Sequence, residues 1–380
     1  MDLQLERITR QSEARLRAAR LPDLVAEPHV KKVQRSKAVV SEFESVLGKE
    51  TVYVSTSGGK DSAALSNLCK AVDPEIKHVM FDTGLEYRDT IELAKSQGAQ
   101  IIPPKTGWKV FCEAKGYPAV SKHVSKRIHD AKISPIGCAL TLFSGPYHLA
   151  DKWLHFLEMP LLISHKCCDE FKKKPAKQLH LNPIIGTRIS ESADRKSAWK
   201  KTGCNSYNLA GTKGVSRPLS LWKDEDVDRY VHENGVPLSK IYTQYEAKRT
   251  GCVCCPYGAH LEQSSRFDLL HELEPKRYEH FMKTPLRQIL LASGVQIKTD
   301  PVYMQDLEQV KKDLARWHEE AAGDDRYFAW KCRWAVEHYG KAAMIEAVRH
   351  IYKDGRGVLI RPLEEIEKGI EFYGQMAMDR

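Results

Sequence analysis

The sequence lacks any long apolar run. No segment approaches the roughly 18 apolar residues that a membrane-spanning helix needs, so we expect no membrane span. The first ten residues, M-D-L-Q-L-E-R-I-T-R, carry both charge signs and no apolar core, so we expect no export signal. The 15 histidines show no H-x-x-x-H spacing, and we find neither an internal repeat nor a low-complexity linker. These absences favour a globular, cytoplasmic protein.

The composition is that of a folded chain with a basic balance. Hydrophobic residues make up 42% and charged residues 29% of 380 positions, enough for one large or two ordinary domains. The net charge is +9. This charge fits a phosphate-rich partner, either a nucleotide or a nucleic acid, and equally fits a basic protein with no polyanionic partner.

The hydrophobic pattern changes twice along the chain. Residues 1–48 read as helical, and residues 259–380 read as helices broken by turns at Thr284, Gly323 and Gly355. Between them, short apolar runs at 52–54, 76–81 and 100–102 alternate with helical stretches at 63–72 and 87–97. Runs at 161–164 and 183–187 are further candidate strands, and residues 224–234 form a candidate helix. We therefore predict an α/β domain over 49–258, with a parallel sheet covered by helices on both faces and helical extensions over 1–48 and 259–380.

A glycine-rich turn follows the first predicted strand. Residues 57–62 read S-G-G-K-D-S, with a helical pattern directly after them. Gly58 and Gly59 let backbone N–H groups approach a phosphate closely, and the next helix offers its N-terminus to the anion. Lys60 adds a positive charge, while Ser57 and Ser62 add hydroxyl donors. The segment resembles the PP-loop of ATP pyrophosphatases, which implies that it grips the pyrophosphate end of a nucleotide.

Two aspartates accompany this turn. Asp61 stands at the start of the predicted helix, where it stabilises the helix dipole and is a candidate catalytic residue with Lys60 and Ser62. Asp82 ends the next strand, at the edge where parallel sheets bind ligands. Asp82 would hold Mg²⁺ or a ribose hydroxyl, or would only cap the strand.

A second candidate anion site lies further along. Gly186 and Arg188 end a predicted strand, and Glu191 and Arg195 follow at short spacing. Two arginines beside a strand end suit the capture of phosphate or sulfate, although isolated surface charges would look the same. Gly186, Arg188, Glu191 and Arg195 are therefore predicted to bind the nucleotide together with the loop and Asp82.

The ten cysteines are unevenly spaced. Cys167 and Cys168 are adjacent, and Cys252 and Cys255 follow as C-x-x-C. Four such thiolates suit a 4Fe–4S cluster, because vicinal thiolates can reach different irons, whereas zinc normally takes pairs with a spacer. Zinc and plain thiols remain alternatives, as does Cys254 in place of Cys255. Cys204 would carry a persulfide or be an ordinary thiol.

The order of these motifs resembles the phosphoadenosine phosphosulfate (PAPS) reductase family. The resemblance rests on the loop, on D-T-G at 82–84, on G-T-R-I-S-E-S-A-D-R at 186–195 and on R-P-L-S-L-W at 217–222, and it covers about residues 35–260. It implies the adenine-nucleotide α-hydrolase-like fold. The pair C-C followed by C-x-x-C is similar to the cluster-bearing branch, which includes adenosine phosphosulfate reductases and the ATP pyrophosphatase subunit of DNA-phosphorothioation systems.

The chain departs from the reductases at its end. Their C-terminal E-C-G-L-H-type segment carries the attacking cysteine, whereas here the last cysteine is Cys332, in W-K-C-R-W. We therefore expect an ATP pyrophosphatase that adenylylates an acceptor for sulfur transfer, using ATP, Mg²⁺ and a 4Fe–4S cluster. The expected partners are an acceptor, which is a nucleic acid or another molecule, and a sulfur donor such as a cysteine desulfurase. The sequence is also compatible with an oligomer. The alternatives are a thioredoxin-driven reductase of adenylyl sulfate or PAPS, and a non-catalytic nucleotide- and cluster-sensing subunit.

Overall fold

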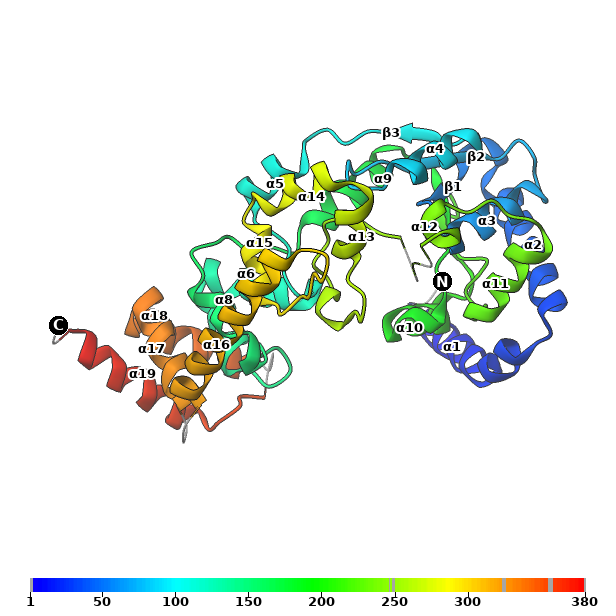
Figure 1. The fold of residues 1–380 in the computed structure, drawn as a ribbon. Helices are drawn as coiled ribbons and strands as arrows, with labels where there is room; N and C mark the ends of the chain where they lie inside the picture. The colour runs from blue at the N-terminus through cyan, green and yellow to red at the C-terminus, as the bar shows by residue number, and fades with distance from the viewer. Residues whose placement is uncertain (1–2, 246, 248–249, 323–325, 355–357, 379–380) are drawn as a thin grey trace. The chain divides into compact units, whose positions relative to one another are not determined.

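The computed structural model describes residues 3–245, 247, 250–322, 326–354 and 358–378 (Figure 1). Contacts divide the chain into two compact units: residues 1–105 with 169–253, and residues 106–168 with 254–380. This grouping cuts across the division into 1–48, 49–258 and 259–380, which stays a prediction about domains. The turns expected at Gly323 and Gly355 lie outside the described residues.

The first unit contains the sheet. Its α-helices are α1 (Leu3–Ala26), α2 (His29–Leu47), α3 (Lys60–Lys70), α4 (Arg88–Ser96), α9 (Lys174–Gln178), α10 (Ala193–Thr202), α11 (Asp224–Glu233) and α12 (Lys240–Thr243). Its strands are β1 (Val52–Thr56), β2 (Lys77–Phe81), β3 (Gln100–Ile102), β4 (Asn182–Ile185), β5 (Asn205–Tyr207) and β6 (Gly214–Ser216). Short turns are η1 (Lys49–Thr51), the π-helical η3 (Asp169–Lys173) and η4 (Ile189–Glu191).

The six strands form one mostly parallel sheet in the order β3-β2-β1-β4-β6-β5. Only β5 runs antiparallel to its neighbour β6. From β1 the chain continues to β2 and β3 on one side, while β4 pairs with β1 on the other. The strand order therefore reverses between β1 and β4, and such a switch point leaves a crevice at the carboxyl ends of the two strands. The predicted α/β class is confirmed.

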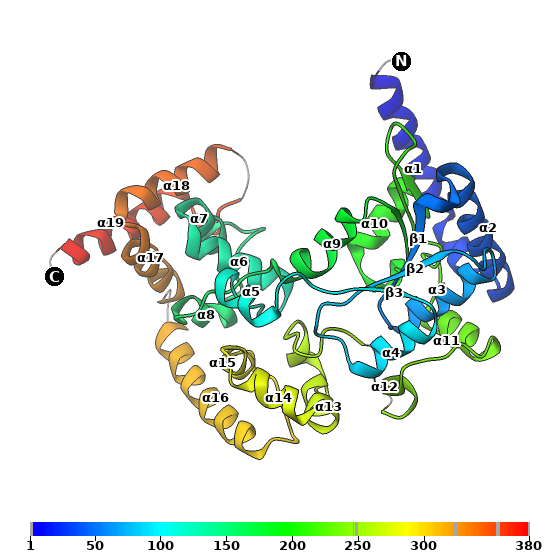
Figure 2. The same cartoon turned by 90° about the horizontal axis from the view of Figure 1, so that it is seen from above.

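Alternation along β1 explains how the sheet is covered. Val52 and Val54 are fully buried in a core shared with α2, α3 and α11. Tyr53 points to the other face, where its ring lies 6.2 Å from that of Phe81. On the first face, the hydroxyl of Tyr230 on α11 donates to Asn67 on α3 at 2.9 Å, which fixes α11 beside α3 (Figure 2). The core thus positions the N-terminal ends of both helices.

The second unit is helical. It contains α5 (Trp108–Lys115), α6 (Lys122–Ile133), α7 (Pro135–Phe143), α8 (His155–Glu158), α13 (Arg266–Leu273), α14 (Pro275–Met282), α15 (Leu286–Ala292), α16 (Pro301–Ala322), α17 (Arg326–Tyr339), α18 (Lys341–Lys353) and α19 (Leu363–Met378), with turns η2 (Asp151–Trp153) and η5 (Ala259–Leu261). The strand predicted at 161–164 is wrong: Ile163 makes only a single bridge to Tyr117, and no neighbouring strand extends the pairing there. None of the helices among the described residues combines the length and apolar character needed to cross a bilayer.

A buried histidine makes the second unit sensitive to acid. His155 Nε2 donates to the carbonyl of Ala292 at 3.1 Å, and burial lowers the pKa of His155 from 6.5 to about 4. The unfolded chain therefore binds a proton between pH 6.5 and 4 that the folded chain rejects. As the pH falls from 6.5 to 4, we expect the free energy of unfolding to fall by about 3 kcal/mol, as measured by denaturant titration at each pH. His155→Gln should lose most of this slope, and an unchanged slope would contradict the assignment.

Candidate functional site

The loop after β1 depends on one glycine. Gly58 adopts a φ of +72°, and a Cβ atom there would lie 1.9 Å from Cγ2 of Thr90 on α4. Gly59, by contrast, has an ordinary φ of −74° and is the N-cap residue of α3. The backbone at Gly58 therefore needs the absence of a side chain both for its conformation and for its packing.

The two loop serines hold the turn together. The Ser62 hydroxyl donates to the carbonyl of Gly59 at 2.8 Å and accepts the N–H of Ser57 at 3.2 Å. The structure thus brings Ser57 and Ser62 together. The contacts described are those of a rigid turn, and the phosphate role of the two hydroxyls stays a prediction.

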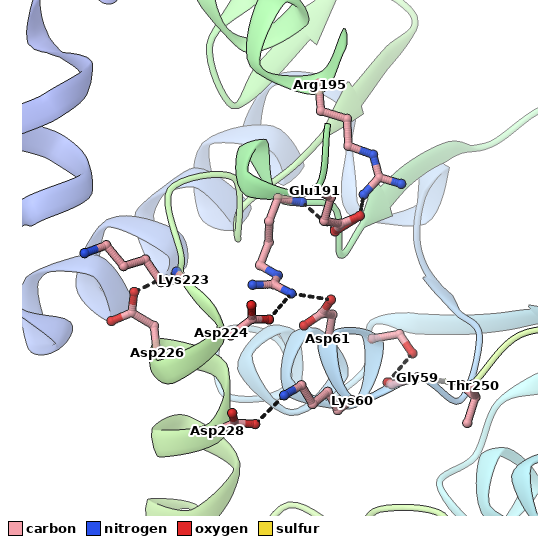
Figure 3. Close-up of polar contacts among 12 residues, drawn as sticks. Gly59, Lys60, Asp61, Glu191, Arg195, Lys223, Asp224, Asp226, Asp228 and Thr250 are labelled. Atoms are coloured by element: carbon pink, nitrogen blue, oxygen red, sulfur yellow. Dashed lines mark hydrogen bonds and ion pairs between the residues drawn. The ribbon is translucent and has the colours of Figure 1, made fainter. Parts of the chain in front are cut away.

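Lys60 is paired with a residue of α11. Its Nζ lies 2.5 Å from Oδ1 of Asp228 (Figure 3). Lys60 is the first residue of α3, so its charge stands at the positive end of that helix dipole. Sequence reasoning identified Lys60 and missed Asp228.

Arg188 joins β4 to the start of α3. Nη2 of Arg188 lies 3.3 Å from Asp61 and 2.7 Å from Asp224 on α11 (Figure 3). The backbones are also close, since a Cβ atom at Gly186 would lie 3.1 Å from the carbonyl oxygen of Asp61. Burial raises the pKa of Asp61, and the Arg188 guanidinium opposes this rise. The predicted residues Asp61, Gly186 and Arg188 therefore form one cluster.

Arg188 retains hydrogen-bonding capacity inside the protein. The residue is only 6% exposed, and its Nε and Nη1 have no hydrogen-bond partner among the described residues. Buried donors normally find acceptors, so two unmatched nitrogens on one guanidinium are suited to an oxygen-rich anion.

A cavity of about 280 Å³ adjoins this guanidinium. Its lining includes three arginines and one aspartate: Arg188, Arg195, Arg217 and Asp194. Burial lowers the pKa of Arg217 and that of Arg195, although the Arg195 side chain is still 42% exposed. The planar, charged guanidinium groups of this lining suit the binding of phosphate or sulfate.

Glu191 has a supporting role in this wall. Its carboxylate accepts the backbone N–H of Arg188 at 3.1 Å and forms an ion pair with Arg195. Glu191 thus fixes the loop between β4 and α10. The structure brings all four predicted residues of this second anion stretch into one region, and it adds Arg217 from the loop after β6.

The Asp82 side chain stabilises the turn in which it lies. Its Oδ1 accepts the N–H of Gly84 at 2.7 Å, which is the capping alternative. Sequence reasoning missed Glu86, whose buried carboxylate accepts both the N–H and the hydroxyl of Thr83 at 2.9 Å or less. Burial raises the pKa of Glu86. The Mg²⁺ or ribose role of Asp82 stays a prediction.

The four predicted cluster ligands fall in both units. Cys252 belongs to the first unit, where its sulfur lies 3.8 Å from the Thr83 hydroxyl. Cys167, Cys168 and Cys255 belong to the second unit. There, burial raises the pKa of Tyr257, and electrostatic interaction with these three thiols raises it further.

The arrangement of the cysteines does not by itself define a metal centre in the described residues. Within the described part of the chain, no group of three or more histidine, cysteine, aspartate or glutamate side chains has a metal-binding arrangement. Three neighbouring thiols nevertheless provide the donor type that iron–sulfur clusters use. The Cys204 thiol accepts a hydrogen bond from the Trp199 indole at 3.4 Å, and burial raises its pKa, which disfavours the thiolate.

The missed residues share one property. Thr90 on α4, Arg217 after β6, and Asp224 and Asp228 on α11 come from three separate segments that the fold brings together. Two signals were available: Arg217 begins the R-P-L-S-L-W motif, and the i, i+4 spacing of Asp224 and Asp228 places both on one face of a helix. That spacing does not say which cations the face will meet.

The similarities found between this chain and known proteins are distant. No family model matches the chain. An uncharacterized protein of Methanocaldococcus jannaschii is 20% identical over 257 residues, or 66% of this chain and 51% of that protein, so the chain spans about half of its length. A crystal structure of phosphoadenylyl-sulfate (PAPS) reductase from Candida auris in a phosphate complex matches 57% of this chain and 87% of that chain, at 14% identity and a TM-score of 0.35. A TM-score of this size carries no argument about substrate or mechanism.

Proposed function

We propose that the chain is an enzyme that binds an adenine nucleotide at the carboxyl ends of β1 and β4. The observation that carries the proposal is Arg188, whose two unmatched buried nitrogens lie on the guanidinium that contacts the start of α3. The strand order reverses at this point, and helix N-termini and arginines both favour phosphate. The loop at Gly58 supplies the close backbone approach that a polyphosphate needs.

The reaction that this arrangement supports best is adenylyl transfer. An oxygen of the acceptor would attack the α-phosphorus of ATP, and the bond to the β-phosphate would break so that pyrophosphate leaves with the electron pair. Lys60, Arg188 and the amides at the start of α3 would hold the charge that develops on pyrophosphate. Sulfur would then enter by displacing AMP. If the donor is a persulfide, its outer sulfur forms the new bond and the acceptor stays linked to the donor cysteine through an S–S bond. A second thiol must then attack the donor sulfur, which releases the sulfur on the acceptor and leaves a disulfide between the two thiols.

Cofactors and partners follow from the same proposal. Mg²⁺ would neutralise part of the triphosphate charge. Cys167, Cys168, Cys252 and Cys255 would hold a 4Fe–4S cluster, which supplies redox or sulfur chemistry when bound. The net charge of +9 supports a nucleic-acid acceptor. Iron and sulfide analysis of protein purified without oxygen tests the cluster independently of the nucleotide site.

Lys60 provides the direct test of this function. Incubated with ATP, Mg²⁺, a sulfur donor and DNA or RNA, the protein should release pyrophosphate, which a coupled phosphate assay measures. Lys60→Met should reduce the rate about a hundredfold, since the charge on the leaving group loses its nearest cation. Lys95→Met, on the exposed side of α4, is the matched control and should keep the rate. Equal rates for Lys60→Met and the control would contradict the proposal.

A sulfonucleotide reductase is the second candidate, favoured by the three arginines around the cavity. It needs an attacking thiolate. Cys332, the last cysteine, is fully buried in α17, and burial raises its pKa to about 12, so it is poorly suited to that task. Sulfite production from adenylyl sulfate or PAPS with thioredoxin would establish this candidate. Nucleotide binding without any turnover would instead favour a sensing subunit.

A further inference from the structure

Helix α11 turns an acidic face toward the proposed phosphate-binding cations. Asp224 and Asp228 are one helical turn apart. Asp224 lies 2.7 Å from Arg188, and Asp228 lies 2.5 Å from Lys60 (Figure 3). Each of the two cations assigned to the polyphosphate therefore has a carboxylate of the same helix as its neighbour.

The charges around the site do not favour an anion by themselves. The cationic side chains of the ion-pair network and the cavity lining are Lys60, Arg188, Arg195 and Arg217, and the carboxylates are Asp61, Glu191, Asp194, Asp224 and Asp228. Five carboxylates thus face four cations. A region that is to bind a molecule with three or four negative charges carries one negative charge in excess.

This excess has a consequence for the form of the ligand. When phosphate oxygens take Lys60 and Arg188, the carboxylates of α11 lose their partners but stay on the rigid helix next to the phosphates. Like charges at such distances repel, although water screens part of this repulsion because both aspartate side chains are more than half exposed. A polyphosphate whose charge is partly neutralised by a divalent cation meets much less of this repulsion and is attracted by the carboxylates.

We propose that Asp224 and Asp228 are specificity-determining residues that make the site accept a polyphosphate as its magnesium complex in preference to the free anion. The inference rests on the proposed nucleotide binding, and it adds that the magnesium complex is the form of the nucleotide that binds. It assigns no metal ligand, because the selection arises from the field of the helix face rather than from coordination.

The test compares ATP binding by calorimetry in the presence of Mg²⁺ and in the presence of EDTA. The wild-type protein should bind ATP at least about tenfold more tightly with Mg²⁺. Asp228→Asn should strengthen ATP binding in EDTA by about fivefold, a modest factor because the Lys60–Asp228 pair is partly exposed. The ratio of the affinity with Mg²⁺ to the affinity in EDTA should therefore decrease. Asp224→Asn should act in the same direction, and the double variant should narrow the ratio further.

Glu225→Gln is the matched control, since it removes the same charge from the same turn of α11, where Glu225 is exposed like Asp224 and Asp228 but pairs with neither Lys60 nor Arg188. It should keep the wild-type ratio. An unchanged ratio in both aspartate variants, or an equal change in the control, would overturn the inference while leaving nucleotide binding intact. If no protein binds ATP with or without Mg²⁺, the proposed function fails and this inference with it. Thermal melting confirms that each variant folds.

Discussion

Gly58→Ala is expected to abolish nucleotide binding and to lower the free energy of unfolding of the first unit by about 3 kcal/mol. The Cβ atom would lie 1.9 Å from Cγ2 of Thr90, and the backbone has a φ of +72°. Strain and overpacking at such positions each cost about 1 to 3 kcal/mol. The loop would have to move away from α4 and lose its phosphate geometry. Calorimetry with ATP and denaturant titration measure the two effects.

A second substitution separates the clash from the strain. Thr90→Ser removes the obstructing methyl group and keeps the hydroxyl that donates to Ser239 at 3.3 Å. Gly58→Ala combined with Thr90→Ser should therefore recover part of the stability, because Cβ of residue 90 would then be the nearest side-chain carbon at 3.3 Å. Gly98→Ala is the control for strain alone, with a φ of +82° and no atom within 4 Å. Equal losses for Gly58→Ala and Gly98→Ala would contradict this account of the loop.

Arg188→Met is expected to weaken the binding of pyrophosphate by about a hundredfold. The substitution removes the buried guanidinium with its two unmatched nitrogens and leaves Asp61 without its partner. Charge-assisted hydrogen bonds contribute about 1.5 to 3 kcal/mol each, so losing one or two gives this factor. Arg188→Lys should recover only part of the affinity, since lysine keeps the charge but not the planar fork. Isothermal titration with pyrophosphate gives the values.

Two further variants control this result. Arg229→Met removes an exposed arginine of α11 that pairs with Glu233 at 2.7 Å, and it should leave the affinity unchanged. Arg188→Met combined with Asp61→Asn should restore the stability lost in the single variant, because no buried carboxylate remains unpaired. The affinity should stay low in that double variant. Wild-type affinity in Arg188→Met would place the anion elsewhere.

The sheet could be predicted because its signals are local. The runs at 52–54, 76–81, 100–102 and 183–187 correspond to β1, β2, β3 and β4, since each run is short, rich in apolar residues and bounded by turn residues. The loop at 57–62 was predictable for the same reason: two glycines, a lysine and a helix start stand together in the sequence. Parallel pairing then brings the ends of β1 and β4 to one edge.

The ion pairs could not be predicted because their partners are far apart in the chain. Asp224 meets Arg188 across 36 positions, and Asp228 meets Lys60 across 168. The grouping of residues 106–168 with 254–380 depends on contacts between distant parts of the chain, which the sequence pattern does not show. The strand expected at 161–164 failed since three apolar residues followed by a serine do not specify a pairing partner.

The central claim is that the amides at the start of α3, together with Arg188, hold a polyphosphate. A crystal structure with a non-hydrolysable ATP analogue and Mg²⁺ tests this most directly. We predict that the terminal phosphates lie against the backbone of Gly58–Ser62 and the Arg188 guanidinium, with the α-phosphate open to an attacking acceptor. An analogue bound at another site, with no phosphate at these amides, would contradict the account.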